Sequence, residues 1–186
     1  MSNCMSDDDN NTVEPGSEAS VKESECSEKK PDKGFSPKAR HKARSFLLQA
    51  VYQWQVNKGP IYALEAQFRA EFDMKGSDTE YFHELLNGVL THTAELDQLY
   101  EPYLDRKLEN IDMIEKAILR IGTYELKYRL DVPYQVVLNE AIELAKIFGA
   151  EESHKYVNSI LDRLSQRVRR TEFEAYRQRR QRKPKP

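Results

Sequence analysis

The sequence predicts an all-α protein, and three observations carry that prediction. Apolar residues recur three and four positions apart over most of residues 36–168, which is the spacing of one face of a helix. Proline, glycine and small polar residues interrupt this pattern at places typical of helix ends. No run of alternating apolar and polar residues flanked by hairpin turns is present, so no strand is predicted.

The first half of this region predicts three helices. The first begins at Ser36-Pro37 and ends before Gly59-Pro60. The second carries the apolar residues Tyr62, Leu64, Ala66, Phe68 and Phe72. Asp78 is predicted to cap the third, whose apolar residues continue to Leu99 before Pro102 interrupts the pattern.

The second half predicts three more helices. The fourth begins at about Asp112 and carries Ile114, Ile118 and Ile121 on its apolar side. Asp131 and Pro133 begin the fifth, and Gly149 is expected to close it as the residue after the C-cap. Ser153 is expected to cap the sixth, which carries Val157, Ile160, Leu161 and Leu164.

Charge is segregated along the chain, although the whole chain has a net charge of only −2. Residues 1–34 hold nine acids and four lysines, for a net charge of −5. Residues 35–58 carry +5, residues 59–162 carry −10, and residues 163–186 carry +8. Two basic segments therefore flank an acidic body, an asymmetry that bears on binding partners rather than on the fold.

These patterns divide the chain into three parts. Residues 1–35 are polar and acidic, and their composition cannot bury enough apolar surface to offset the entropy of ordering, so we expect a disordered leader. Residues 36–168 form the helical domain. Residues 169–186 end in RQRRQRKPKP and are expected to be frayed helix or a solvated basic tail. No apolar run approaches the length of a bilayer span and no signal segment comes after Met1, which favours a cytoplasmic protein.

No pattern in the sequence indicates catalysis, a metal or a cofactor. The cysteines, Cys4 and Cys26, both lie in the leader, and the four histidines lack ligand spacing. Phosphate-binding glycine loops and nucleophile elbows are absent. The polar row Ser153, His154, Tyr156 and Asn158 first suggests an active site, but it contains neither a metal nor a nucleophile pattern, and capping explains Ser153.

The start of the first helix is the best candidate for binding. Lys38, Arg40, His41, Lys42 and Arg44 lie there, and positive charge at a helix N-terminus opposes the helix dipole. Basic side chains attract phosphates, and the aromatic residues Tyr52 and Trp54 further along could stack on unpaired bases. The plain alternatives are a solvated helix start and aromatic residues that belong to the core.

Several blocks of the sequence resemble the NusB family of bacterial transcription antitermination factors. The blocks are ARHKARSFLLQAVYQWQ, YFHELLNGVLTHTAELDQLYEPYL, IEKAILRIGTYELKYR and VPYQVVLNEAIELAKIFGAEESHKYVNSILD. Together they cover about residues 38–164. The resemblance implies one compact all-helical domain of two perpendicular bundles that has no catalytic activity. It also implies binding of boxA RNA in rRNA leader transcripts together with NusE, a small-subunit ribosomal protein, with other Nus factors and RNA polymerase joining the assembly.

The resemblance also assigns residues. Basic contacts to RNA fall on Lys38, Arg40, His41, Lys42 and Arg44, with His41 and Lys42 where arginine is common in the family. Aromatic contacts fall on Tyr52, Tyr103, Phe148 and Tyr156, each of which could equally be a core residue, and Glu152 lies beside that surface. Contacts to NusE fall on Glu109 and Glu115, with Arg120 nearby.

Two rival interpretations come from other classes of protein. A related helical domain precedes an rRNA cytosine methyltransferase, but that enzyme needs a subsequent nucleotide-binding domain and a catalytic cysteine, which we do not expect in 186 residues. The other rival is a pure protein adaptor whose basic ends are incidental. The sequence leaves self-association, including a homodimer, open. We also hypothesise that the acidic leader competes with RNA for the basic helix.

Overall fold

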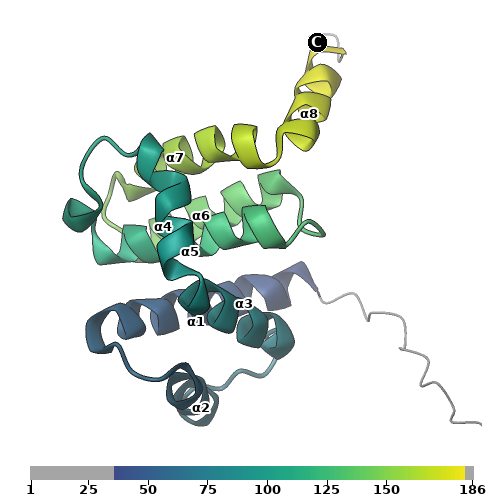
Figure 1. Ribbon diagram of the computed structural model, residues 1–186. Helices are drawn as coiled ribbons and strands as arrows, with labels where there is room; N and C mark the ends of the chain where they lie inside the picture. Colours follow the sequence, from purple (N-terminus) through teal and green to yellow (C-terminus); the bar gives the residue numbers. More distant parts are fainter. Residues whose placement is uncertain (1–35, 183–186) are drawn as a thin grey trace, which may run out of the picture. The chain divides into compact units, whose positions relative to one another are not determined.

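The computed structural model describes residues 36–182, so the leader predicted for residues 1–35 lies outside the described part of the chain (Figure 1). This part contains eight α-helices, two short 3₁₀ helices and no strand. The helices are α1 (Pro37–Asn57), α2 (Ile61–Glu71), α3 (Thr79–Thr91), α4 (Thr93–Tyr100), α5 (Met113–Tyr128), α6 (Tyr134–Phe148), α7 (Ser153–Val168) and α8 (Arg170–Arg182). The 3₁₀ helices η1 (Glu101–Tyr103) and η2 (Leu108–Asn110) connect α4 to α5. The all-α prediction is confirmed.

Helix α5 is the centre of the fold. All ten residues from Ala117 to Leu126 are buried, as expected for a helix surrounded by others. It packs against α1 and α3 on one side and against α4, α6 and α7 on the other. Helix α2 packs against α1 and α3, and α8 contacts α7. Figure 1 shows the group of α1, α2 and α3 below the group of α4, α6 and α7, with α5 joining them.

The apolar stripes predicted from the sequence form one continuous core. It includes Leu47 and Val51 of α1, Phe82 and Leu85 of α3, Ile118 and Ile121 of α5, Val137 and Leu144 of α6, and Ile160 and Leu164 of α7.

Asp78 caps α3 as predicted, and Asp112, where the fourth helix is predicted to begin, caps α5. The Asp78 carboxylate accepts a hydrogen bond from the backbone N–H of Tyr81, and that of Asp112 accepts from Ile114 and Glu115. Each satisfies backbone donors that the first helical turn leaves without an intrahelical partner.

Two predicted helix boundaries are wrong. The helix expected from Asp78 to Leu99 is split at His92, where the hydroxyl of Thr93 donates to the carbonyls of Val89 and Leu90. Such back-bonding bends helices. Ser153 is the first residue of α7 rather than its cap, which is Glu152.

Gly149 ends α6 as predicted, but for a different reason. Its φ of −89° is not left-handed. Glycine is favoured because an added Cβ would lie 2.7 Å from the Ala145 carbonyl oxygen and 2.8 Å from Cβ of Ser153. The tight α6–α7 connection therefore depends on the missing side chain.

The segment expected to be frayed helix or a basic tail begins with a buried residue. Arg169, predicted as its first residue, is only 7% exposed, and α8 continues as a helix to Arg182. Within residues 36–182, no helix is both long and apolar enough to cross a bilayer.

Candidate nucleic-acid interface

The basic start of α1 lies at the surface, and neighbouring elements hold three of its side chains. Lys38 is exposed at its outer end. The Arg40 guanidinium lies 3.5 Å from Asp78 and 3.4 Å from Asp131. His41 Nδ1 is 2.8 Å from Glu140 of α6. The Lys42 ammonium donates to the carbonyl oxygens of Asp73 and Lys75, at 3.3 Å and 2.7 Å. Exposed Lys38 and half-buried Arg40, His41 and Lys42 form the part of the basic cluster that solvent reaches.

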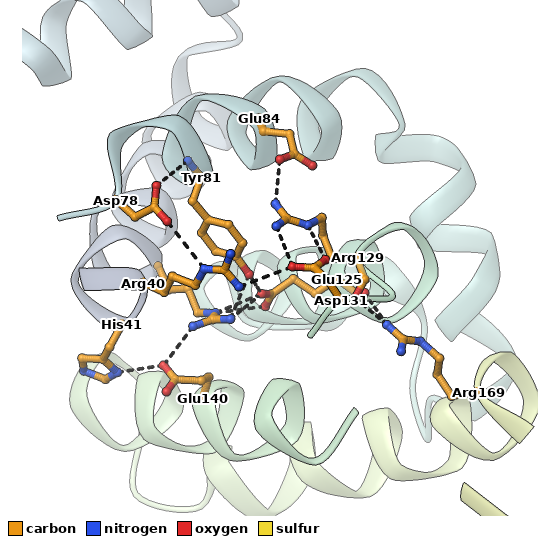
Figure 2. A network of polar contacts seen from close by, with 11 residues as sticks. Arg40, His41, Asp78, Tyr81, Glu84, Glu125, Arg129, Asp131, Glu140 and Arg169 are labelled. Carbon is orange, nitrogen blue, oxygen red and sulfur yellow. Dashed lines mark hydrogen bonds and ion pairs between the residues drawn. The ribbon is translucent and has the colours of Figure 1, made fainter. Parts of the chain in front are cut away.

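Arg44 is placed differently, because its side chain is buried against Tyr81 of α3 and Glu125 of α5. Figure 2 shows these two partners close together. The Arg44 side chain is 2% exposed, and so is that of Glu125, its main partner. Arg44 donates from Nε and Nη2 to the Glu125 carboxylate at 3.0 Å and 2.7 Å, and from Nη2 to the Tyr81 hydroxyl at 2.8 Å. The Tyr81 hydroxyl also donates to Glu125. A guanidinium buried in this way presents no surface to a phosphate, so we reassign Arg44 from RNA contact to fold support.

The Tyr81 ring is the hub of this network. The guanidinium carbons of Arg40, Arg44 and Arg129 lie 4.9, 5.1 and 4.7 Å from its centroid, within the range of cation–π interactions. Burial, with the Glu125 carboxylate adding to it, raises the pKa of Tyr81, so its hydroxyl stays a neutral donor. Burial alone would lower the pKa of Arg44, but the Glu125 carboxylate outweighs burial and raises it. Tyr81 therefore stays neutral and Arg44 stays positively charged within this network.

Asp131, in the loop between α5 and α6, links this network to the surface. It accepts from Arg129 Nε at 2.8 Å and Nη2 at 2.9 Å. These hydrogen bonds from Arg129, aided by Arg40, lower the pKa of Asp131 to about 2. Arg129 also reaches Glu84 of α3 at 2.6 Å. The basic start of α1 is thus tied to the α5–α6 loop and to α3.

Tyr52 and Phe148, both predicted RNA contacts, line one apolar groove between α1 and α6. The groove has a volume of about 430 Å³, and besides residues of α1 and Phe148 it is lined by Phe68 and Phe72 at the end of α2 and by Ile114 of α5. Tyr52 is 41% exposed, so part of its ring is open to a stacking partner. His41 and Tyr52 are both on α1, and Glu140 and Phe148 are both on α6. The His41–Glu140 contact therefore lies near the start of α1, and the groove of Tyr52 and Phe148 lies further along the same helix. The structure therefore brings the exposed basic cluster and two predicted aromatics onto one edge of the molecule.

The remaining predicted aromatics lie around η1 and α7. Tyr103 and Tyr156 are half-buried and pack against the core. The Arg106 guanidinium covers the Tyr156 ring at 4.8 Å. Burial, with the nearby Asp105 carboxylate, raises the pKa of Tyr156 to about 12. These two tyrosines therefore belong to a neighbourhood of their own, around η1, rather than to the groove of Tyr52.

Glu152, predicted to lie beside the RNA surface, is exposed at the start of α7. Its carboxylate pairs with Lys155 one helical turn later, at 2.7 Å. Exposed pairs of this kind contribute little to stability. A ligand could therefore replace Lys155 as the partner of Glu152 at little cost in stability.

The predicted contacts to NusE also divide into an exposed residue and buried ones. Glu109 of η2 is exposed, and Glu115 is 9% exposed. Arg120 is 6% exposed and donates to both carboxylate oxygens of Asp97, at 2.8 Å and 2.7 Å, and to Gln55 at 2.7 Å. We reassign Arg120, like Arg44, from partner contact to buried support.

Sequence reasoning missed the acidic partners of these arginines. Glu125 lies on the buried central helix and Glu140 lies on α6, yet both contact residues of α1. A charged residue flanked by apolar ones, as Glu125 is between Tyr124 and Leu126, was the available signal. A single sequence does not say which distant arginine it would pair with.

The fold and this edge define a class: an all-helical binding domain with exposed cations beside an apolar, aromatic-lined groove. Residues 41–166 match the model of the NusB family. The chain belongs to this family of transcription antitermination proteins.

The similar proteins agree with this assignment. "Transcription antitermination protein NusB" of Alcanivorax borkumensis is 56% identical over 137 residues, which are 74% of this chain and 91% of the relative. The protein of the same name from Photorhabdus laumondii is 54% identical over 136 residues, 73% of this chain and 99% of the relative. Among solved structures, NusB of T. maritima superposes with a TM-score of 0.63 at 29% identity, covering 73% of this chain and 96% of that one.

A second solved structure contains partners. It is a crystal structure of antitermination factors NusB and NusE in complex with double-stranded RNA. It superposes with a TM-score of 0.62 at 22% identity, covering 70% of this chain and 98% of that one. At this identity the likeness supports the fold alone.

Proposed function

We propose that this protein is a non-enzymatic, cytoplasmic RNA-binding factor that recognises boxA RNA together with NusE and helps to assemble an antitermination complex, with other Nus factors, on RNA polymerase. One observation carries the proposal: half-buried His41, which contacts α6, lies on the same side of α1 as the groove of Tyr52 and Phe148, and exposed Lys38 and half-buried Lys42 add positive charge at the start of this helix. Cations attract the RNA backbone, and an exposed ring can stack on an unpaired base. The NusB–NusE–RNA complex of a structural relative supports the choice of partners.

Within this surface, each residue has a proposed part. Lys38, Arg40, His41 and Lys42 contact phosphates, while Tyr52 and Phe148 receive a base. Tyr103, Tyr156 and Glu152 border the surface, and stacking on Tyr156 requires Arg106 to move off its ring. NusE contacts Glu109 and the edge of Glu115.

The first experiment is a titration of boxA RNA and a scrambled RNA, with and without NusE, at several salt concentrations. We expect preference for boxA, a steep fall of affinity with salt, and tighter binding with NusE. Equal, weak binding of both RNAs in the presence of NusE would favour the adaptor interpretation.

A charge variant tests the basic cluster. Lys38→Gln with Lys42→Gln removes two phosphate contacts, so the slope of log affinity against log salt should become shallower by about 1–1.5. The matched control is Arg69→Gln with Lys127→Gln, which removes the same charge from α2 and α5. Equal effects of the two double variants would show general electrostatics rather than a site.

A second pair of variants tests the groove. Tyr52→Ala should weaken boxA binding by about 1–3 kcal/mol, the usual effect of removing one aromatic stacking partner. Tyr62→Ala is the control, because Tyr62 is also an exposed tyrosine, 78% accessible, but lies on α2. Thermal melting of both variants separates lost binding from lost stability.

A further inference from the structure

Helix α8 lies outside residues 41–166, which match the family, but it is firmly attached to the fold. Arg169, just before it, donates to the backbone carbonyls of Leu126, Glu125 and Arg129 at 2.5, 3.1 and 2.7 Å. These oxygens lie in the last turn of α5 and at the residue after it. The carbonyls of Glu125 and Arg129 also accept from the backbone N–H groups of Arg129 and Val132, so Arg169 adds a second donor to each, as well as a donor to the Leu126 carbonyl. Arg169 therefore caps α5 and fixes the start of α8.

The first two turns of α8 also dock on the start of α6. The Glu172 carboxylate accepts from the backbone N–H of Tyr134 at 3.0 Å and from Arg169 at 2.9 Å. The rings of Phe173 and Tyr176 lie 5.8 Å and 6.0 Å from that of Tyr134, in tilted and edge-on arrangements. These contacts hold the rest of α8 in a defined direction.

The later turns of α8 are strongly basic. Arg177 and Arg179 are exposed, and neither forms an ion pair within the described residues, whereas Arg170 pairs with Glu174 at 2.8 Å. Positive charge near a helix C-terminus is favourable in itself, which is the plain structural explanation. That explanation accounts for one or two cations, but residues 163–186 carry a net charge of +8.

A groove of about 490 Å³ runs beside these arginines between α6, α7 and α8. Its walls include the amides of Gln135, Asn139 and Asn158, together with Tyr176 and Arg177. The carboxylate of Asp162 also lines it, and accepts a hydrogen bond from Gln166. Amides both donate and accept hydrogen bonds, as the edges of unpaired bases do, and Tyr176 is 40% exposed. The lining therefore fits a nucleotide better than an apolar side chain.

The groove and the basic cluster of α1 adjoin the same loop. Arg40 of α1 contacts Asp131, and Arg169 donates to the carbonyl of Arg129, two residues earlier. Residues 129–134 thus separate the two basic segments and contact both. A strand bound on α1 could continue past this loop to α8.

We propose that α8 binds the phosphate backbone of single-stranded RNA flanking the element held at α1 and α6, with one base in the groove between α6, α7 and α8. The proposal rests on the proposed function of the α1–α6 edge and extends it. The guanidinium fork matches the oxygens of phosphates and carboxylates alike. The choice of RNA over an acidic protein surface therefore rests on the adjoining groove, whose amides and Tyr176 suit a base.

The test compares two RNAs, the boxA element alone and the same element with single-stranded flanks on both sides. Arg177→Gln with Arg179→Gln should bind the short RNA like the wild type. On the flanked RNA it should lose affinity several-fold, with a salt slope shallower by about 1–1.5. Asn139→Ala, which alters only the groove, should weaken flanked RNA without changing the slope. Arg69→Gln with Lys127→Gln again controls for charge.

The outcomes separate the two proposals. If the wild type does not prefer boxA in the short RNA, the proposed function fails, and this extension fails with it. If the wild type prefers boxA but the α8 variant binds flanked RNA with unchanged affinity and slope, only the assignment of α8 is overturned. That result would leave α8 to an acidic protein partner. Both arginines are exposed, so a melting temperature equal to that of the wild type is expected.

Discussion

At the scale of single residues, burial separates arginines that look alike in the sequence. Arg40 and Arg44 lie one helical turn apart in the same basic run, yet Arg40 is partly exposed and Arg44 is 2% exposed. Arg44 and Glu125 satisfy each other in the core, and removing one partner leaves the other charged and buried. The basic run therefore serves both the fold and the surface.

This difference predicts the effect of single substitutions. Arg44→Ala should lower the free energy of unfolding by about 3–5 kcal/mol, the usual result of breaking a buried ion pair. Arg40→Ala should cost clearly less, because solvent screens its partly exposed pairs. Urea denaturation of both variants measures the difference. Equal stability of Arg44→Ala and the wild type would contradict the buried role.

Asp131 predicts a pH dependence. Its pKa is about 2 in the folded protein, against about 3.9 for an ordinary unfolded aspartate. Its contribution is therefore complete above about pH 4 and is lost as the pH falls from about 4 to about 2. Asp131→Asn should be less stable than the wild type at pH 7, and the difference should shrink through that window. Denaturation at pH 7, 4 and 2.5 checks this, and a constant difference would exclude it.

At the scale of helices, most of the fold could be predicted from local signals. Proline and capping residues mark the starts at Pro37, Asp78 and Asp112, and the apolar spacing marks the core faces. The split at His92 could not be predicted, because no glycine or proline marks it and the bend comes from hydroxyl bonds of Thr93. The exposed basic cluster was predictable as a run of charges. The burial of Arg44 and Arg120 was not, because Glu125 and Asp97 lie 81 and 23 residues away.

The close packing of α3 on α5 yields a prediction that runs against helix propensity. Alanine normally stabilises a helix interior relative to glycine by about 1 kcal/mol. At Gly88, however, an added Cβ would overlap the ring of Tyr124, which is 8% exposed and packs on Tyr128. Gly88→Ala should therefore destabilise the protein by about 1–3 kcal/mol.

Gly59→Ala provides the matched control, because nothing lies within 4 Å of the Cβ that it would add. Its melting temperature should stay near that of the wild type. A Gly88→Ala variant more stable than the wild type would contradict this prediction, because it would mean that α3 and α5 can move apart to accommodate the added methyl group at little cost.

At the scale of the whole molecule, the segregation of charge predicts an effect of the acidic leader. Residues 1–34 carry −5 and precede a segment of +5. If the leader competes with RNA for that segment, deleting residues 2–34 should tighten RNA binding at low salt and have little effect at high salt, where the attraction is screened. Affinities at two salt concentrations test this, and an unchanged low-salt affinity would contradict it.

The capping of α5 by Arg169 has a practical consequence for anyone choosing where to end the chain. An expression boundary placed at residue 166, where the family match stops, would delete this arginine and with it three hydrogen bonds to carbonyl oxygens at the end of the central helix. It would also remove Glu172, which supports the first turn of α6. Shortened versions should therefore retain residues through Tyr176, and affinity tags belong beyond Arg182.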